Sequence, residues 1–509
     1  MLCTLRSVMQ ERPERSLKFV PPSPTTGFIY RPRLGQALAR GLAGQLVLLL
    51  APDGYGKTSL LASMARDWDR FSKASPARHL AWFQLDPSDD DPTLFVEGLV
   101  GSLQRALPGF GKATRAALDG TADLGGRIRH LMSVLVDELR ATVDTPVVLV
   151  LDDFHFLQNR ATVESLEQSL RDPGFPLRLI VSTRADPRFY LSALRSRSAM
   201  VELRAEDLGF TPKEARELVS QRVRRPVSEV EAERLLRDVK GWPSAVNLVA
   251  LALSMGGSRL SVGKLAPTEH NYRRLAAEVV DRLPDDVKEG VLRSSLLRYL
   301  DEASLREGAG LSNAAELLRL VEEKGLPVLR PAGMEEPLFY EPLFRAALKQ
   351  ELASLLLPNE YRMACARVAA YDAARGAWDD AIRGYLDAGA HGEAAAAVER
   401  AADAELSAGH VDTVLRWVRL LPGPTRSRHP RLMVWEAKAL ASRNRWDESR
   451  ALLVTARREL EISRDQEGLG RQRGVWTAVQ LADGRYADAR RSALESLAWL
   501  AEDDHAERA

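Results

Sequence analysis

The chain has 509 residues, enough for about three to four domains of ordinary size. Its 71 Lys and Arg residues nearly balance its 70 Asp and Glu residues, which excludes nucleic-acid binding through bulk positive charge. Apolar residues make up 45% of the chain and charged residues 28%, as in folded globular proteins, so disorder of the whole chain is excluded as well.

Cysteine content and the lengths of the apolar runs lead to an expectation about location. Cys3 and Cys365 are the two cysteines, too few and too far apart for a disulfide framework, which favours a reducing compartment. Apolar runs such as Leu46–Ala51 are far shorter than the roughly 20 residues of a membrane-spanning helix. The first 15 residues lack the sustained apolar stretch of a signal peptide. We therefore expect a cytoplasmic protein.

The first half of the chain predicts an arm followed by an α/β domain. Residues 1–30 are polar and rich in proline, and they are interpreted as an N-terminal arm. Within residues 31–204, short continuous apolar runs alternate with amphipathic stretches, as in parallel sheets whose strands are buried on both faces and joined by helices. The expected strands cover residues 45–50, 79–86, 146–153, 177–184 and 199–204.

The strand pattern then gives way to helices. Residues 205–275 predict a helical domain, in which Thr211 would cap a helix that begins at Pro212 and carries Glu214 three residues after the cap. Residues 276–357 hold helical stretches, a short extended piece and another helix. This order predicts a winged-helix domain.

Residues 358–509 are rich in alanine and leucine and contain a loose recurrence. A small residue, any residue and an aromatic residue recur at Gly376–Trp378, Asn444–Trp446 and Gly484–Tyr486. The first two aromatic residues are 68 positions apart, twice the 34-residue tetratricopeptide length, and the last two are 40 apart. The recurrence favours an α-solenoid of tetratricopeptide-like repeats, with a plain helical bundle as the alternative.

The segment at residues 51–58, A-P-D-G-Y-G-K-T, directly follows an expected strand and opens an expected helix, as a phosphate-binding loop does. Gly54 and Gly56 would let the backbone turn so that its N–H groups face phosphates. The strict pattern has glycine at position 51, where this chain has Ala51. For this segment alone, the alternative is a glycine-rich turn with a solvated lysine.

The residues at the start of the following helix complete the expected loop. Lys57 would reach the β- and γ-phosphates of a nucleotide, and the hydroxyl group of Thr58 would bind Mg²⁺. Ser59 is placed among the expected nucleotide contacts. ATP or ADP together with Mg²⁺ is therefore the ligand that this segment predicts.

Two more expected strands end in charged residues. Asp152 and Asp153 end the apolar run at 147–151, where Asp152 would bind Mg²⁺ and Asp153 would orient or deprotonate the attacking water. Arg184 ends the next run and would contact the γ-phosphate. Ligands bind at the carboxyl ends of strands in open α/β sheets, so these groups predict one nucleotide site.

Five motifs in this order resemble the MalT-type regulators, large ATP-binding regulators of the LuxR class within the STAND group of signal-transduction NTPases. They are A-P-D-G-Y-G-K-T at 51–58, L-D-D-F-H-F-L at 151–157, S-T-R at 182–184, L-G-F-T-P-K-E-A at 208–215 and G-W-P-S-A-V-N-L at 241–248. The resemblance covers roughly residues 18–360 and continues more weakly through the repeats. It implies an α/β P-loop NTPase domain followed by an all-α helical domain, a winged helix and α-solenoid repeats.

The resemblance also implies a mechanism and further site residues. It implies a closed, ADP-bound monomer that opens with ATP and an inducer, hydrolyses ATP slowly and then self-assembles. The inducer, a small molecule or a protein, would bind the helical repeats. Pro243 would lie against the nucleotide base, and an arginine of the segment 30–34, for which we choose Arg33, would approach the nucleotide.

Two features depart from the family pattern. Family members carry a C-terminal LuxR-type helix-turn-helix that reads DNA, and this sequence shows no such segment, so we expect no specific DNA binding by this chain alone. Their winged helix commonly carries a histidine that touches the β-phosphate of ADP, and this chain has Glu341 there. Repulsion between this carboxylate and the phosphate would weaken the closed state.

We interpret the chain as an ATP-binding signalling switch with weak ATPase activity that serves regulation. The alternative is a nucleotide-bound scaffold that does not hydrolyse ATP and whose helical repeats bind a protein partner. Asp153 and Arg184 favour the switch, because a scaffold has no need of groups that act on the γ-phosphate. Glu341 and the missing DNA-reading segment leave the scaffold open.

Overall fold

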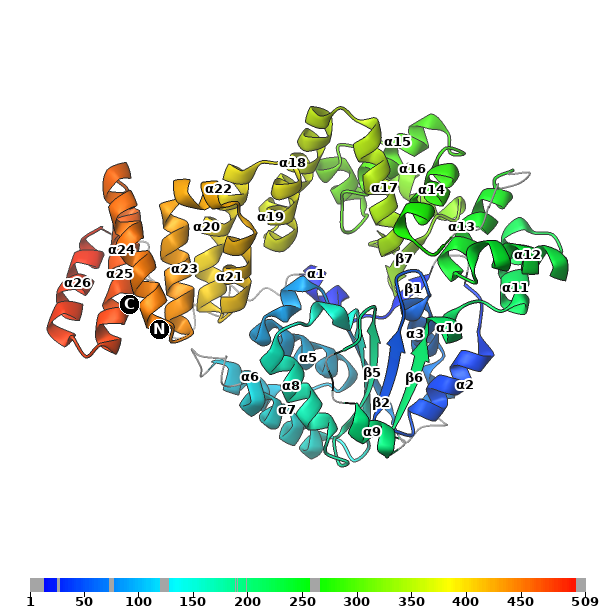
Figure 1. Ribbon diagram of the computed structural model, residues 1–509, viewed down its shortest axis with the longest axis horizontal. Helices are drawn as coiled ribbons and strands as arrows, with labels where there is room; N and C mark the ends of the chain where they lie inside the picture. Colours follow the sequence, from blue (N-terminus) through cyan, green and yellow to red (C-terminus); the bar gives the residue numbers. More distant parts are fainter. Residues whose placement is uncertain are drawn as a thin grey trace. The chain divides into compact units, whose positions relative to one another are not determined.

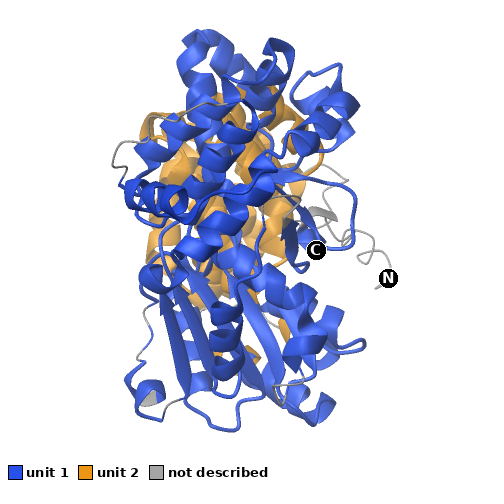
Figure 2. Cartoon of the chain, turned by 90° about the vertical axis from the view of Figure 1, so that its right-hand side faces the viewer, with its two compact units in different colours: residues 1–89, 96–115, 132–364 blue, residues 90–95, 116–131, 365–509 orange. Residues whose placement is uncertain are grey.

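The computed structural model of the chain describes residues 13–24, 28–72, 77–119, 128–187, 189, 191–197, 199–256 and 266–499. The outermost parts of the chain, including Cys3 and the last ten residues, lie outside the described residues. The chain forms two compact units (Figure 2). Unit 1 comprises residues 1–89, 96–115 and 132–364, and unit 2 comprises residues 90–95, 116–131 and 365–509.

Unit 1 is built on a parallel sheet of five strands in the order β3-β4-β5-β2-β6. Figure 1 labels β5, β2 and β6 of this sheet. The strands are β2 (Leu46–Leu50), β3 (His79–Gln84), β4 (Val147–Asp152), β5 (Leu177–Thr183) and β6 (Met200–Arg204). Every residue of β4 is buried, as the continuous apolar run predicts for a strand covered on both faces. The predicted α/β domain is confirmed.

Helices cover this sheet and connect its strands. They are α2 (Pro32–Gly41), α3 (Lys57–Arg66), α4 (Trp68–Ser72), α5 (Pro92–Ala106), α6 (Lys112–Asp119), α7 (Ile128–Thr142), α8 (Arg160–Leu170) and α9 (Ser192–Ser196), with α1 (Pro13–Leu17) before them. The helix α2 packs against β2 and β6. Its buried residues, including Leu34 and Leu38, recur at a spacing of three to four, which places them on one face of the helix.

The helical domain follows with α10 (Ala205–Leu208), α11 (Pro212–Val223), α12 (Glu229–Val239) and α13 (Pro243–Ser254). The predicted capping box is present at the start of α11. The hydroxyl group of Thr211 accepts a hydrogen bond from the N–H of Glu214, and the Glu214 carboxylate accepts one from the N–H of Thr211. Pro212 is the first residue of the helix, where its missing N–H is not needed.

The winged helix comprises α14 (Glu269–Val280), α15 (Asp285–Ser294), α16 (Ala314–Glu323), β7 (Val328–Pro331), β8 (Phe339–Tyr340) and α17 (Pro342–Leu355). Strands β7 and β8 pair antiparallel, which is the hairpin expected of this domain. A third strand, β1 (Pro22–Pro24), pairs with β7 and comes from the N-terminal arm. The arm therefore contributes to the winged-helix sheet, which its sequence does not predict because proline-rich segments are typical of linkers.

Unit 2 contains the helical repeats, which form a row of antiparallel helices (Figure 1). The helices that follow α17 are α18 (Pro358–Ala374), α19 (Trp378–Asp387), α20 (His391–Ser407), α21 (Val411–Leu420), α22 (Gly423–Arg428), α23 (Pro430–Ser442), α24 (Trp446–Ser463), α25 (Gln466–Ala482) and α26 (Tyr486–Trp499). From α23 to α26 each helix packs against the next in sequence. This arrangement is the predicted solenoid of tetratricopeptide-like repeats.

The recurring motif of the sequence marks the start of a helix. Gly376, Asn444 and Gly484 adopt positive φ angles of 74°, 58° and 73°, and the aromatic residue two positions later begins α19, α24 or α26. Gly409 has the same conformation, and Val411 after it begins α21, 33 residues after Trp378 and 35 before Trp446. A further repeat between those of Trp378 and Trp446 therefore starts at Val411. The sequence pattern does not detect it, because valine stands in place of the aromatic residue.

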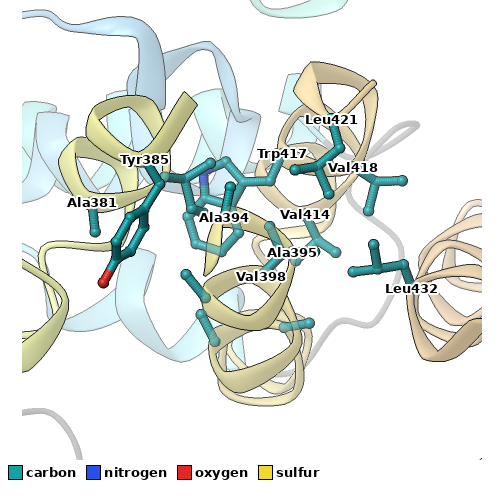
Figure 3. Packing of buried hydrophobic residues seen from close by; sticks show 14 of the residues in the cluster. Ala381, Tyr385, Ala394, Ala395, Val398, Val414, Trp417, Val418, Leu421 and Leu432 are labelled. Carbon is teal, nitrogen blue, oxygen red and sulfur yellow. The ribbon is translucent and has the colours of Figure 1, made fainter. Parts of the chain in front are cut away.

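Small side chains allow the repeat helices to pack closely. One buried cluster joins alanines of α20 to Trp417 of α21, Tyr385 of α19 and Leu432 of α23 (Figure 3). The Nε1 atom of Trp417 donates a hydrogen bond to Oδ1 of Asp379 at 2.7 Å, and Arg416 donates two more to the same carboxylate. Because the indole is 1% exposed, this cluster is the packing centre of the first repeats.

Unit 2 also includes residues 90–95. The Asp91 carboxylate accepts hydrogen bonds from the N–H of Thr93 and the N–H of Thr413, both at 2.9 Å, and the Thr93 hydroxyl donates to the Gly409 carbonyl. Asp91 thus caps the start of α5 and the first turn of α21 together. A search of the described residues for a membrane-spanning helix finds none.

We expect Trp417→Ala to lower the free energy of unfolding by about 3–5 kcal/mol, because it opens a cavity in a packed core. Urea unfolding followed by far-UV circular dichroism measures this loss. The matched control is Tyr486→Ala, because Tyr486 is 72% exposed and its loss should change stability by no more than about 0.5 kcal/mol. Equal losses in the two variants would contradict the assignment of Trp417 to the packing centre.

Candidate functional site

The loop between β2 and α3 turns sharply at two glycines. Gly54 and Gly56 have φ angles of 78° and 75°, a left-handed conformation that glycine adopts without strain. A Cβ atom at Gly54 would also lie 2.7 Å from Nε1 of Trp242. Gly54 is therefore required both by the turn and by the close approach of a second segment.

The alanine at position 51 fits the loop without strain. Ala51 is buried, and its N–H donates a hydrogen bond to the carbonyl of Thr183 at 3.2 Å, which continues the pairing of β2 with β5. Its φ angle is not among the positive ones of the described residues. The conformational freedom of glycine is consequently not needed here.

Lys57 begins α3 and folds back over the loop. Its Nζ donates hydrogen bonds to the carbonyls of Ala51 at 2.7 Å and Pro52 at 3.0 Å. Burial lowers the pKa of Lys57, although the negative charges of Asp53, Asp153 and Asp152 oppose this shift. The ammonium group is thus held among acidic residues and backbone carbonyls at the head of the helix.

Thr58 and Asp152 connect the loop to the end of β4. The Thr58 hydroxyl donates a hydrogen bond to Oδ2 of Asp152 at 2.8 Å, and the Ser182 hydroxyl donates to Oδ1. Burial raises the pKa of Asp152, and both hydrogen bonds counteract this rise. A hydroxyl oxygen beside a carboxylate is the kind of donor set that Mg²⁺ prefers, so these residues fit the predicted metal.

Asp153 follows directly in a constrained conformation. Its φ angle of 57° is left-handed, which aspartate tolerates better than most residues. Its N–H donates a long hydrogen bond of 3.4 Å to the Ser182 hydroxyl. Burial raises the pKa of Asp153, and the charge of Asp152 raises it further. A carboxyl group with a raised pKa is well suited to accept a proton during a reaction.

Arg184 follows β5 and contacts the loop. Its Nη1 lies 2.9 Å from Oδ2 of Asp53, and its guanidinium group lies over the ring of Phe156 at 5.8 Å from the ring centre. The carboxyl ends of β2, β4 and β5 therefore bring the loop, the two aspartates and this arginine together, as the parallel sheet requires.

The start of α13 is hydrogen-bonded to the same loop. The Nε1 atom of Trp242 donates to the carbonyl of Asp53 at 3.1 Å, and the N–H of Ser244 donates to the carbonyl of Gly54 at 3.0 Å. Pro243, between them, is the first residue of α13 and lines a cavity. The G-W-P-S motif thus positions the helical domain against the loop.

Two cavities with common lining residues lie along the loop. The first, here called the apolar cavity, is lined by Phe28, Ile29, Tyr30, Arg31, Gly35, Leu60, Ser63, Met64, Phe71, Phe210, Leu218, Pro243, Ser244, Asn247, Pro327 and Val328, besides the shared residues. The second, the charged cavity, is lined among others by Lys57, Thr58, Asp153 and Arg184. Gly56, Ser59, Leu329 and Glu341 line both. An aromatic, apolar cavity that shares lining residues with a charged one has the composition expected of a pocket for a nucleotide base beside a pocket for its phosphates.

The structure places Arg31, and not Arg33, in the lining of the apolar cavity. Arg31 donates hydrogen bonds to the carbonyls of Leu208 at 2.5 Å and Gly209 at 3.0 Å. Both arginines pair with Glu214, Arg33 at 2.9 Å and Arg31 at 3.5 Å, but Arg33 lines neither cavity. The geometry therefore favours Arg31 over Arg33 as the arginine of this segment that faces a ligand.

Glu341 brings the winged helix into the site. It precedes α17, and its Oε1 accepts a hydrogen bond of 2.9 Å from the Ser244 hydroxyl. Burial raises the pKa of Glu341, the hydrogen bond from Ser244 offsets part of this rise, and the charge of Asp53 adds to it. The carboxyl group thus lies at the junction of the two cavities and is held by a residue of α13.

A second contact ties the winged helix to the end of β3. Asp86 forms ion pairs with Arg298 at 2.7 Å and with Lys18 of the arm at 2.8 Å, and Lys18 also pairs with Asp89 at 2.8 Å. Burial alone would raise the pKa of Asp86, but the charges of Lys18 and Arg298 hold it well below its usual range. Because Lys18, Asp86 and Arg298 all line the charged cavity, this cluster forms part of its wall.

The family model of the MalT winged helix domain matches residues 276–360. The HTH-type transcriptional regulator MalT of Cronobacter sakazakii is 28% identical over 479 residues, which is 93% of this chain and 51% of that regulator. MalT of Klebsiella pneumoniae strain 342 is 28% identical over 487 residues, 92% of this chain and 51% of that regulator. The chain is similar to the MalT-type regulators. The predicted resemblance is thereby confirmed, and the chain spans about half the length of the curated relatives it matches.

A solved structure shows the same fold over most of the chain. It is the signal transduction ATPase with numerous domains (STAND) that carries a tetratricopeptide repeat sensor, from Pyrococcus horikoshii. It superposes with a TM-score of 0.51 and 17% identity, covering 94% of this chain and 71% of that chain. At this level of identity the similarity supports the fold alone.

Several residues of the site are not predicted from the sequence. Asp53 lies within the loop motif, at a position where the motif allows any residue. Its ion pair is formed with Arg184, which lies 131 positions away in the sequence. Phe210 lies in a motif that carries the family resemblance, without a role assigned to it. Lys18 and Arg298 belong to segments without a recognisable motif, and only the folded chain brings them to Asp86.

We expect Glu341→Gln to raise the free energy of unfolding at pH 7.5 relative to that of the unmodified chain. The folded-state pKa of Glu341 lies above its usual value of 4.5. The free energy of unfolding of the unmodified protein therefore falls as the pH rises above 4.5, whereas glutamine does not titrate and causes no such fall. The gain should shrink as the pH falls towards 4.5. Urea unfolding at the two pH values measures it.

Exposed Glu335 of the same domain provides the control, and Glu335→Gln should change stability by no more than about 0.5 kcal/mol at either pH. A gain in Glu341→Gln that is the same at both pH values would contradict the buried, titrating carboxyl group.

Proposed function

We propose that the chain is an ATP-binding switch of a MalT-type regulator, closed with ADP and open with ATP, that hydrolyses ATP slowly. The observation that carries this proposal is the hydrogen bond between Thr58 and Asp152, together with Lys57 and Arg184 in the wall of one cavity. A phosphate-binding loop, a carboxylate that holds the metal and an arginine at the γ-phosphate are among the groups that recur in sites of phosphoryl transfer.

The ligand of the site would be ATP or ADP. The base would lie in the apolar cavity between Tyr30, Phe210 and Pro243, where aromatic and apolar walls suit a planar ring. Arg31 would approach the nucleotide from the same cavity. The phosphates would lie along the loop at the N-terminus of α3, where free N–H groups and the helix dipole favour negative charge.

The charged side chains would have distinct roles. Lys57 would exchange its bonds with the Ala51 and Pro52 carbonyls for bonds to the β- and γ-phosphates. Thr58 and Asp152 would hold Mg²⁺, which neutralises phosphate charge when bound. Asp153 would accept the proton of the attacking water at its carboxylate, and Arg184 would contact the γ-phosphate.

The winged helix would sense the nucleotide through the residues it contributes to the cavities. Glu341 lines both of them, and Arg298 is paired to Asp86 at the end of β3. A change of nucleotide at these walls would bias the domain between a docked and a released position. Release would allow the self-assembly proposed for the ATP-bound form, with the inducer, a small molecule or a protein, binding the helical repeats. DNA binding is not among the activities we propose for residues 1–509.

Lys57→Ala tests nucleotide binding. We expect the affinity for ATP to fall by about 30- to 150-fold, which corresponds to the roughly 2–3 kcal/mol of a charged hydrogen bond or two. Isothermal titration calorimetry of the full chain measures this loss. The control is Lys213→Ala, which removes one exposed positive charge from α11 and should leave the affinity unchanged within about twofold. Equal ATP affinity in the two variants would overturn the proposal.

Asp153→Asn separates the switch from a scaffold that does not hydrolyse ATP. We expect ATP binding to persist and slow hydrolysis to fall by about 100-fold or more, because the amide cannot accept the proton. Single-turnover hydrolysis measures the rate, and Asp144→Asn, at an exposed position before β4, serves as the control. Binding of ATP without any turnover in the unmodified chain would favour the scaffold.

A further inference from the structure

Asp53 is an acidic residue in the middle of a loop proposed to bind phosphates. Its carboxylate lines the charged cavity with Lys57 and Arg184, and its Oδ2 lies 2.9 Å from Nη1 of Arg184. The two side chains are 33% and 43% exposed, so solvent and an incoming ligand can reach the ion pair. A loop that only had to attract phosphates would not need a negative charge at this position.

The charge of Asp53 acts on the whole site. It raises the pKa of Asp153 and that of Glu341, and it opposes the fall in the pKa of buried Lys57. The charge of Asp53 therefore affects both Lys57, which is proposed to hold the phosphates, and Asp153, which is proposed to act on them. A further negative charge in the same cavity would be repelled by Asp53 more strongly than by any neutral loop residue.

Arg184 can form an ion pair with Asp53 or with a phosphate, and pairing with both weakens each contact. In the proposed arrangement, the first two phosphates of a nucleotide lie on the loop, Lys57 contacts the second and third, and only the third reaches Arg184. A nucleoside diphosphate therefore leaves the pair of Asp53 with Arg184 intact. A nucleoside triphosphate must compete with the Asp53 carboxylate for the guanidinium group and places its added charge beside it.

We propose that Asp53 is a specificity-determining residue that favours a nucleoside diphosphate over a triphosphate by competing with the third phosphate for Arg184. This inference rests on the proposed nucleotide site and names which ligand of that site is preferred. It assigns the resting preference for the diphosphate to the loop itself, in addition to any contribution from the winged helix.

The backbone contacts of the loop make Asp53 a good position for substitution. The carbonyl of Asp53 accepts the bond from Trp242, and the carbonyl of Gly54 accepts the bond from Ser244. Neither contact uses the Asp53 side chain, so Asp53→Asn keeps the loop attached to α13 and removes only the charge. Asp53→Ala gives a second test on the same grounds.

The experiment measures the dissociation constants of ATP and ADP, each with Mg²⁺, for the full chain and its variants by isothermal titration calorimetry. In Asp53→Asn, the ratio of the ATP constant to the ADP constant should fall by about fivefold, the effect of a partly exposed charge pair. The ADP constant should stay within about twofold. Asp69→Asn, at an exposed position of α4, removes the same charge outside both cavities and should leave the ratio unchanged.

A double variant tests whether Asp53 acts through Arg184. In an Arg184→Gln background, Asp53→Asn should change the ratio by less than in the unmodified chain, because the competition for the guanidinium group is gone and only the direct repulsion between Asp53 and the third phosphate remains. An unchanged ratio in both Asp53→Asn and Asp53→Ala, or equal shifts of both constants, would overturn the inference while leaving the nucleotide site in place. Failure of the unmodified chain to bind either nucleotide would overturn the proposed function and this inference together.

Discussion

The parallel pairing of β2, β4 and β5 is the constraint on which the rest of unit 1 depends. Each of these strands is buried, and each ends at the same edge of the sheet, so whatever residue follows a strand is brought to that edge. The hydrogen bond from Thr58 to Asp152 joins the loop after β2 to the end of β4, although the two residues are 94 positions apart in the sequence. If these strands did not run in the same direction, the loop, the acidic pair and Arg184 would not lie at the same edge of the sheet.

The loop after β2 is the point where the domains of unit 1 meet. Its side chain at Asp53 pairs with Arg184, while its carbonyls accept hydrogen bonds from the start of α13. Ser244 of α13 then reaches Glu341 at the start of α17. Strand ends, helical domain and winged helix are therefore connected through consecutive polar contacts.

Unit 2 is stabilised differently, by small side chains and by turns that require a left-handed residue. Alanines of α20 let Trp417 and its neighbours pack closely. Ion pairs connect Arg431 of α23 to Asp465 at the start of α25, and Arg450 of α24 to Asp483 at the end of α25. The exposed ion pair of Arg450 with Asp483 contributes at most about 1 kcal/mol, so the buried clusters carry most of the stability.

The sequence by itself determined the element order, the capping box of α11, the loop motif and the two acids at the end of β4, because each depends on neighbours in the chain. Buried parallel strands leave continuous apolar runs, and a turn with a left-handed residue leaves a glycine or asparagine, so both are readable locally. Only the tertiary structure decided that Asp53 pairs with Arg184, that Arg31 rather than Arg33 lines the apolar cavity, and that β1 joins the winged-helix sheet. These contacts join segments far apart in the chain, and no local pattern encodes which distant partner a side chain meets once the strands and helices have packed.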